Sequence, residues 1–169
     1  QIQQMLNSEH GGLNEVFADA AQISGDMRYL ELAKRFSHRK VLDPLLEGKD
    51  CLTGMHANTQ IPKVIGYKRI ADIEGNQEWD KAAGFFWETV VENRSITIGG
   101  NSVCEHFHPS DDFSSMLESE QGPETCNTYN MLRLTKMLFE TSGDSRYMDY
   151  YERALYNHIL SSVNPVQGG

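Results

Sequence analysis

A repeated turn constrains the fold of this chain more than any other feature of its sequence. Residues 23–30 read Ile-Ser-Gly-Asp-Met-Arg-Tyr-Leu, and residues 141–148 read Thr-Ser-Gly-Asp-Ser-Arg-Tyr-Met. A weaker copy at residues 73–79 has Gly-Asn in place of Gly-Asp. In each copy the glycine can adopt the left-handed conformation that ends a helix, and the Asp or Asn side chain can cap the next helix. The turns therefore predict three hairpins of antiparallel helices.

Apolar residues on either side of these turns recur with the helical period. The three stripes are Leu13, Val16, Phe17, Ala20 and Ala21; Trp79, Ala82, Ala83, Phe86 and Val90; and Tyr147, Tyr151, Ala154, Leu155 and His158. Such spacing is typical of the buried face of an amphipathic helix. Further helices are expected at about residues 26–38, 60–73 and 125–141, and one short strand at 95–98. Because the hairpins follow at irregular intervals, an all-α array of helix pairs such as an α/α barrel is favoured over a short-period solenoid.

The charge balance excludes several classes of partner. The 169 residues carry a formal net charge of −9. Nucleic acids and anionic membranes require clustered Lys and Arg, so neither is expected. No apolar run approaches the roughly 20 residues that cross a bilayer. The first residues lack the basic start and apolar core of a signal peptide. The sequence therefore assigns the protein to no compartment. A neutral substrate such as a sugar suits this charge.

The three cysteines are an odd number and are expected to be reduced and mostly buried.

Residues 93–123 form a long connection between predicted helices, and such connections are usually functional or disordered. Its aromatic residues and two histidines argue against disorder. The pair Gly99-Gly100 would let the backbone approach a ligand closely. Glu105 has apolar and aromatic neighbours in the sequence, which would raise its pKa toward that of a general acid. The alternative is that Glu105 is a surface carboxylate and that His106 and His108 are solvated loop residues.

A carboxylate and a thiol stand two residues apart at Glu124 and Cys126, and both are zinc ligands in proteins. On a regular helix such residues point about 200° apart, so both can bind one ion only if the chain is extended or irregular there. Otherwise Glu124 interacts with the helix dipole and Cys126 is a small core residue. His10 and His56 precede predicted helices, where loops can line a pocket, although polar residues there more often cap the helix.

Five motifs occur in order along the chain and together resemble the β-L-arabinofuranosidase family, glycoside hydrolase families 127 and 146. They are His10-Gly11-Gly12-Leu13-Asn14-Glu15, the Ser-Gly-Asp-x-Arg-Tyr turns, His56-Ala57-Asn58-Thr59, Gly99-Gly100-Asn101-Ser102 with Glu105-His106-Phe107, and Glu124-Thr125-Cys126-Asn127-Thr128-Tyr129-Asn130-Met131. The resemblance implies a catalytic (α/α)6 barrel with added β-domains and a retaining mechanism in which a zinc-bound cysteine thiolate is the nucleophile. It implies that Glu105 is the acid/base, that Glu124 and Cys126 are zinc ligands, and that His10 and His56 bind substrate.

The chain departs from the family at the nucleophile. The resemblance implies two more cysteines, adjacent in sequence and downstream of the Glu-x-Cys motif, and neither is present before Gly169. Residues 1–169 are therefore expected to be part of a catalytic barrel domain, inactive alone, with an incomplete zinc site and apolar helix faces that the rest of the protein or other chains would cover. Two alternatives are a noncatalytic helical scaffold or carbohydrate-binding module, and a glycosidase in which Glu105 acts opposite Asp111 or Asp112.

Overall fold

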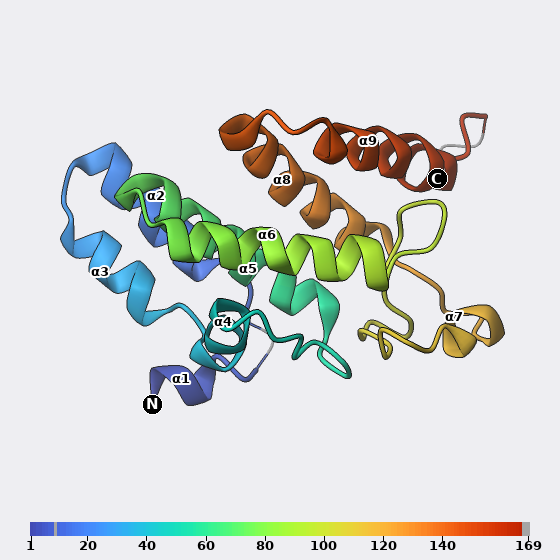
Figure 1. Cartoon of the computed structure of the whole chain (residues 1–169), viewed down its shortest axis with the longest axis horizontal. Coiled ribbons are helices and arrows are strands. Elements are labelled where there is room, and N and C mark those ends of the chain that lie inside the picture. Colours follow the sequence, from blue (N-terminus) through green and yellow to red (C-terminus); the bar gives the residue numbers. More distant parts are fainter. Residues whose placement is uncertain (9, 167–169) are drawn as a thin grey trace. The chain divides into compact units, whose positions relative to one another are not determined.

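The computed structural model describes residues 1–8 and 10–166, and in this part of the chain every regular element is helical (Figure 1). The α-helices are α1 (Ile2–Met5), α2 (Leu13–Ser24), α3 (Arg28–Arg35), α4 (Arg39–Leu46), α5 (Ala57–Glu74), α6 (Gln77–Asn93), α7 (Ser114–Glu118), α8 (Thr125–Ser142) and α9 (Ser145–Ala154). A π-turn (Leu155–Ile159) and a short 3-10 turn (Leu160–Ser162) follow α9. The predicted all-α class is confirmed.

The three repeated turns adopt the predicted geometry. Their glycines have left-handed φ angles of 73° at Gly25, 69° at Gly75 and 68° at Gly143. The following Asp or Asn caps the next helix by accepting from a backbone N–H, at 3.0 Å for Asp26 and Arg28, 3.1 Å for Asn76 and Glu78, and 3.0 Å for Asp144 and Arg146. The hairpins α2–α3, α5–α6 and α8–α9 therefore arise from local sequence alone.

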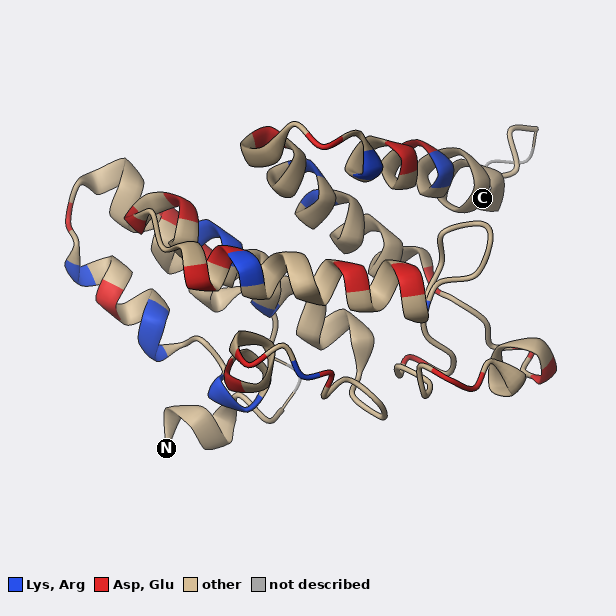
Figure 2. Ribbon diagram, in the orientation of Figure 1, with Lys and Arg blue, Asp and Glu red and all other residues tan. Residues whose placement is uncertain are grey.

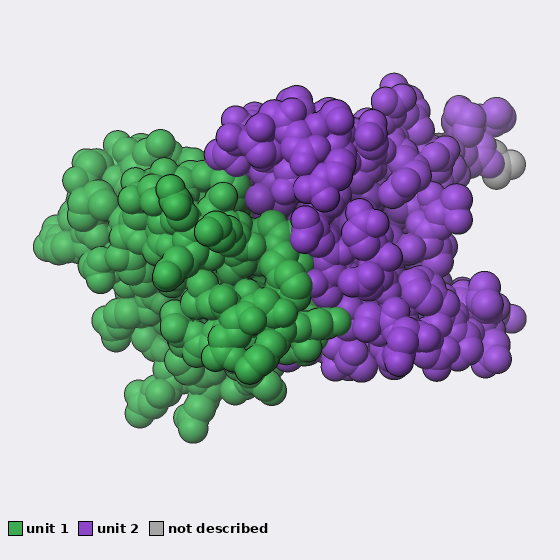
Figure 3. Space-filling view, viewed as in Figure 1, with its two compact units in different colours: residues 1–52, 58–86 green, residues 53–57, 87–169 purple. Residues whose placement is uncertain are grey.

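The contacts divide the chain into two compact units, one of residues 1–52 and 58–86 and the other of residues 53–57 and 87–169 (Figure 3). In unit 1, α2, α3 and α5 share a core of small and aliphatic side chains: Ala18, Ala21, Leu30, Ala33 and Ile70. Helix α2 also approaches α5 closely, because Asn14 donates to the Lys63 carbonyl at 2.8 Å and a Cβ at Gly66 would lie 2.2 Å from the Asn14 side chain.

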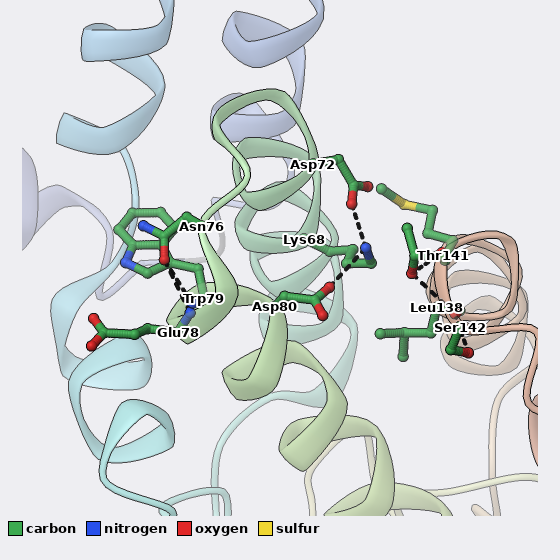
Figure 4. Close-up of polar contacts among 10 residues, drawn as sticks. Lys68, Asp72, Asn76, Glu78, Trp79, Asp80, Leu138, Thr141 and Ser142 are labelled. Carbon is green, nitrogen blue, oxygen red and sulfur yellow. Dashed lines mark hydrogen bonds and ion pairs between the residues drawn. The ribbon is translucent and has the colours of Figure 1, made fainter.

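A buried lysine links the two helices of the second hairpin within unit 1 (Figure 4). The Lys68 side chain is fully buried on α5 and pairs with Asp72, one turn further along the same helix. Its Nζ also lies 2.8 Å from Oδ1 of Asp80 on α6. Two carboxylates around one buried ammonium offset the cost of removing that charge from water.

In unit 2, the C-terminal part of α6 packs on the hairpin α8–α9 through an aromatic cluster. The Trp87 indole donates to the Thr135 hydroxyl at 2.8 Å. Its ring meets Tyr147 and Tyr150 nearly edge-on, with centroids 4.6 and 5.8 Å apart. The loops of residues 94–124 connect α6 and α8, the two helices that this cluster joins.

Helices α1, α4 and α7 were not predicted, because they are short and none follows a Gly-Asp or Gly-Asn turn, the signal that indicated the short helix α3. Three expectations about the elements were wrong in part. Helix α5 begins three residues before the expected residue 60. Residues 95–98 form a turn instead of a strand, with the Gly99 N–H donating to the Ile96 carbonyl at 2.8 Å. Val16 is 60% exposed, because α2 buries the face that carries Asn14, Ala18 and Ala21.

Among the described helices, none combines the length and the apolar character needed to span a membrane.

Candidate active site

Glu105 lies in a strained two-residue turn. Val103 and His106 exchange both backbone hydrogen bonds, each 3.0 Å long, around Cys104 and Glu105. The φ angles of these two central residues are 45° and 66°, the combination found in type I′ turns, which favour Asn-Gly. A left-handed conformation costs a residue with a side chain about 1–2 kcal/mol. Strain of this kind is concentrated at functional sites, where the surrounding structure maintains it.

Unit 2 maintains this turn by pairing it with the segment that precedes α5. The Ala57 N–H donates to the Glu105 carbonyl at 2.8 Å, and the Phe107 N–H donates to the Met55 carbonyl at 2.9 Å. The Gly54 N–H in turn donates to the Phe107 carbonyl at 2.8 Å. Residues about fifty positions apart are thereby held in register, which a local sequence pattern cannot specify.

The pairing brings together two predicted site residues that belong to separate motifs. His56 Nε2 lies 3.9 Å from Glu105 Oε2, and the His56 ring meets the His106 ring edge-on with centroids 5.4 Å apart. The Glu105 side chain is 59% exposed, so the apolar surroundings expected for it are absent from this structure. The reason is that Phe107, its aromatic neighbour in the sequence, is buried. Glu105 faces solvent and His56 is partly exposed beside it, so both can contact one ligand.

Glu124 and Cys126 converge at the start of α8. Glu124 is the N-cap residue and has extended backbone angles (φ −92°, ψ 144°), whereas Cys126 already belongs to the helix. This irregularity brings Cys126 Sγ to 3.6 Å from Glu124 Oε2, which meets the geometric condition set by their spacing. Cys51, Cys104 and Cys126 form no disulfide among the described residues, and the expectation that they are mostly buried was wrong: Cys104 and Cys126 are exposed and Cys51 is partly exposed.

The separation of these two atoms suits a shared zinc ion. Tetrahedral zinc holds sulfur at about 2.3 Å and oxygen at about 2.1 Å, which places two such ligands about 3.6 Å apart. Thiolate and carboxylate are also the right donor types. Within residues 1–8 and 10–166, however, no group of three or more His, Cys, Asp or Glu side chains could hold a metal. The pair therefore fits half of a four-ligand site, and its zinc role stays a prediction.

The Cys126 thiol is held in its neutral form without a cation. Burial and then the negative charge of Glu124 raise the pKa of Cys126 above its ordinary value. A divalent cation between the two groups would reverse the effect of the carboxylate and favour the thiolate.

Replacement of Glu124 by glutamine is therefore expected to accelerate alkylation of Cys126 in the metal-free chain. Loss of the carboxylate charge lowers the pKa of the thiol and increases the thiolate fraction. The expected increase at about pH 8 is roughly two- to four-fold, because a lower pKa raises the thiolate fraction but also makes each thiolate a weaker nucleophile. Iodoacetamide labelling followed by peptide mass spectrometry measures it, with Cys51 as the internal reference. An unchanged Cys126 rate, or an equal rise at Cys51, would contradict this account.

Glu105 and Glu124 line one hollow in unit 2, with a volume of about 590 Å³. Its lining residues are Cys104, Glu105, Glu120, Gln121, Gly122 and Glu124. The sequence from 95 to 132 contains six acidic residues and no Lys or Arg, and in Figure 2 the ribbon of these loops is red at its acidic positions. A hollow of this charge suits a metal cation or a neutral sugar and disfavours an anionic substrate.

Other selected residues have structural roles or lie elsewhere. A Cβ at Gly99 would lie 2.6 Å from Ala154 Cβ. This glycine therefore permits close packing against α9, whereas the sequence had suggested that it lets the backbone approach a ligand. His108 is buried and within 3.2 Å of the carbonyl oxygens of three residues, so it is not a solvated loop residue. Asp112 accepts from the Ser114 N–H at 2.9 Å near the start of α7. His10 belongs to unit 1, and its substrate role stays a prediction.

The fold is that of part of an (α/α)6 barrel, the class to which structurally similar glycoside hydrolases belong. The chain belongs to the β-L-arabinofuranosidase family GH127, whose catalytic-domain profile matches residues 1–169. No match was found among curated proteins.

Three solved structures resemble the chain. A GH127 β-arabinofuranosidase shares 24% identity with a TM-score of 0.75, covering 92% of this chain and 26% of its own. A GH127 β-L-arabinofuranosidase from Geobacillus stearothermophilus shares 20% identity with a TM-score of 0.71, covering 92% of this chain and 29% of its own. A protein described as a glycoside hydrolase shares 19% identity with a TM-score of 0.65, covering 88% and 29%. The chain thus spans less than a third of the length of each.

Proposed function

We propose that residues 1–169 are one part of the catalytic domain of a retaining glycoside hydrolase that releases β-linked L-arabinofuranose, or a related sugar, from plant-type glycans. Membership of family GH127 supports this reaction class. The observation that carries the proposal is the convergence of Glu105 and Glu124 on one hollow, with Cys126 beside Glu124. The nucleophile, a second cysteine, would come from sequence beyond this chain.

The residues of this chain would divide the chemistry between them. The Glu105 carboxyl would protonate the glycosidic oxygen as the bond breaks, and the resulting carboxylate would then take a proton from the attacking water. His56, 3.9 Å from that carboxylate, would donate a hydrogen bond to a sugar hydroxyl and orient the ring. Glu124 and Cys126 would hold zinc, which when bound supplies the charge that keeps cysteine sulfur deprotonated.

The strained turn argues against the noncatalytic alternative. A helical scaffold or carbohydrate-binding module has no need for Glu105 at a position that favours Gly and costs stability. The two-carboxylate alternative needs Asp111 or Asp112 opposite Glu105, but the residues that share the hollow with Glu105 include Glu120 and Glu124 and neither aspartate. The arrangement therefore favours the zinc and thiolate chemistry.

The proposal is tested by hydrolysis of a chromogenic β-L-arabinofuranoside by the full-length protein, before and after treatment with a chelator. We expect turnover that the chelator abolishes and added zinc restores, since loss of zinc lets the thiolate protonate. Cys126→Ser is expected to lose bound zinc, measured by elemental analysis, and to lose activity with it. Activity that survives both the chelator and thiol-blocking reagents would instead support the two-carboxylate mechanism, and zinc content unaffected by Cys126→Ser would support the scaffold. The 169-residue chain alone is expected to be inactive.

A further inference from the structure

A π-turn at the end of α9 presents a buried histidine to the segment that carries Glu124 and Cys126. The five residues Leu155–Ile159 form this turn, and His158 within it is only 6% exposed. The π-helical conformation is rare, and single turns of it within a helical run are frequently found at functional sites. The sequence periodicity places His158 in an apolar stripe, but both of its ring nitrogens have polar partners.

The two partners define the protonation of the ring. His158 Nε2 lies 3.1 Å from the Pro123 carbonyl oxygen, and Nδ1 lies 2.7 Å from the Thr128 hydroxyl. A carbonyl can only accept, so Nε2 carries the proton and donates it. Nδ1 then accepts from Thr128 as the unprotonated nitrogen of a neutral imidazole. Burial, the larger effect, lowers the pKa of His158 and favours this neutral form.

The partners of His158 lie on both sides of the Glu124–Cys126 pair. Pro123 immediately precedes Glu124, and Thr128 follows Cys126 by two residues. The first hydrogen bond of α8, from the Thr128 N–H to the Glu124 carbonyl, is long at 3.5 Å and restrains this segment weakly. The imidazole therefore supplies a restraint on the N-cap geometry that the helix itself does not provide.

The same ring also touches the loop that leads to Glu105. A Cβ at Gly100 would lie 2.9 Å from His158 Cε1, so this loop rests directly on the imidazole. In the same loop, Ser102 follows Asn101, and its hydroxyl accepts a hydrogen bond from the Asn127 side chain of α8 at 2.6 Å. The ring thus contacts both of the segments that line the hollow.

We propose that His158 and Thr128 are positioning residues, which hold Glu124 and Cys126 in the convergent arrangement that a metal ion requires. This inference rests on the proposed zinc role of that pair. Neither side chain is a ligand itself. Partners of this kind typically change metal affinity about 10- to 100-fold when they are removed.

The test compares two matched pairs of variants in the full-length protein. His158→Leu removes both hydrogen bonds, whereas His158→Gln retains an N–H for Pro123 and an oxygen for Thr128. Thr128→Val removes the hydroxyl without changing the side-chain shape, whereas Thr128→Ser retains it. The readouts are zinc affinity by competition with a chelator, the thiolate charge-transfer absorption of the cobalt-substituted protein, and Tm.

We expect His158→Leu and Thr128→Val to weaken zinc binding about 10- to 100-fold and to alter the cobalt spectrum, with the Gln and Ser variants within about three-fold of wild type. Folded Leu and Val variants with unchanged zinc affinity would overturn the inference, as would a Gln variant as weak as the Leu variant. If His158→Leu does not fold, the Thr128 pair decides. A wild-type protein that binds no zinc also overturns it. A zinc-loaded protein without arabinofuranosidase activity overturns the proposed function alone.

Discussion

Replacement of Glu105 by glutamine in the full-length protein is expected to lower kcat/KM for an alkyl β-L-arabinofuranoside about 10²- to 10⁴-fold, the usual contribution of a general acid. Glutamine has the same shape as glutamate and can remain near His56, but it cannot supply the proton that the departing oxygen needs. The loss should be smaller for a nitrophenyl arabinofuranoside, because that leaving group departs without full protonation. The difference between the two substrates identifies the acid role and separates it from a general loss of binding.

Two further variants control for position and for backbone strain. Asp112→Asn keeps an oxygen that accepts from the Ser114 N–H and is expected to retain wild-type activity. Glu105→Gly removes the acid and also relieves the positive φ of 66°, so it should lose activity while the free energy of unfolding rises by about 1 kcal/mol. If Glu105→Gln hydrolyses both substrates at the wild-type rate, Glu105 is not the acid. A collapse of activity in Asp112→Asn would instead favour the two-carboxylate mechanism.

Acidification from about pH 7 to pH 4 is expected to destabilise unit 1 through His38. This residue lies at the start of α4, is 4% exposed, and has its Nδ1 3.1 Å from the Nζ of buried Lys63. The Lys63 ammonium also donates to the Leu6 carbonyl at 2.7 Å and to Gln60 Oε1 at 3.2 Å. Since an ammonium can only donate, His38 must accept, and a proton on its ring would remove that acceptor and place two cations side by side.

The sign and the size of this effect follow from the pKa of His38. Burial, with the charges of Lys63 and Lys40, lowers it from 6.5 to about 4. Because the folded-state pKa is depressed, the stabilisation is present above pH 6.5 and is lost as the pH falls toward 4. The difference of about 2.5 units corresponds to about 3 kcal/mol of unfolding free energy. Burial lowers the pKa of Lys63 to about 8, so its own contribution changes only at higher pH.

Urea unfolding of the 169-residue chain across this pH range measures the effect, and His38→Asn is the matched control. Asparagine keeps an oxygen near the position of Nδ1 to accept from Lys63, does not titrate, and is a favourable residue at a helix N-cap. The fall in unfolding free energy between pH 7 and pH 4 should be about 3 kcal/mol smaller in the variant, although other carboxylates titrate in both proteins. Parallel pH profiles for the two proteins would show that His38 is not responsible.

The helical hairpins could be predicted from the sequence, because the signals for them are local. A glycine that ends one helix and an Asp or Asn that caps the next lie within two residues of each other, and the geometry at Gly25, Gly75 and Gly143 follows from that adjacency. The motif order also indicated the family, which the match over residues 1–169 confirms. Where the local signal was weak, as in the short helix α4, no element was predicted.

The geometry of the candidate site could not be predicted from the sequence, because it depends on contacts between distant segments. The left-handed turn at Glu105 depends on hydrogen bonds to Met55 and Ala57, which are distant in sequence, and no local preference would place glutamate there. The sequence pattern assigned His158 to an apolar face, whereas its buried polar partners lie about 30 positions away. The exposure of Glu105 could not be predicted from its apolar neighbours either. Side-chain environment is set by which segments meet in space, and hydrogen bonds between distant segments leave no periodic signal in the chain.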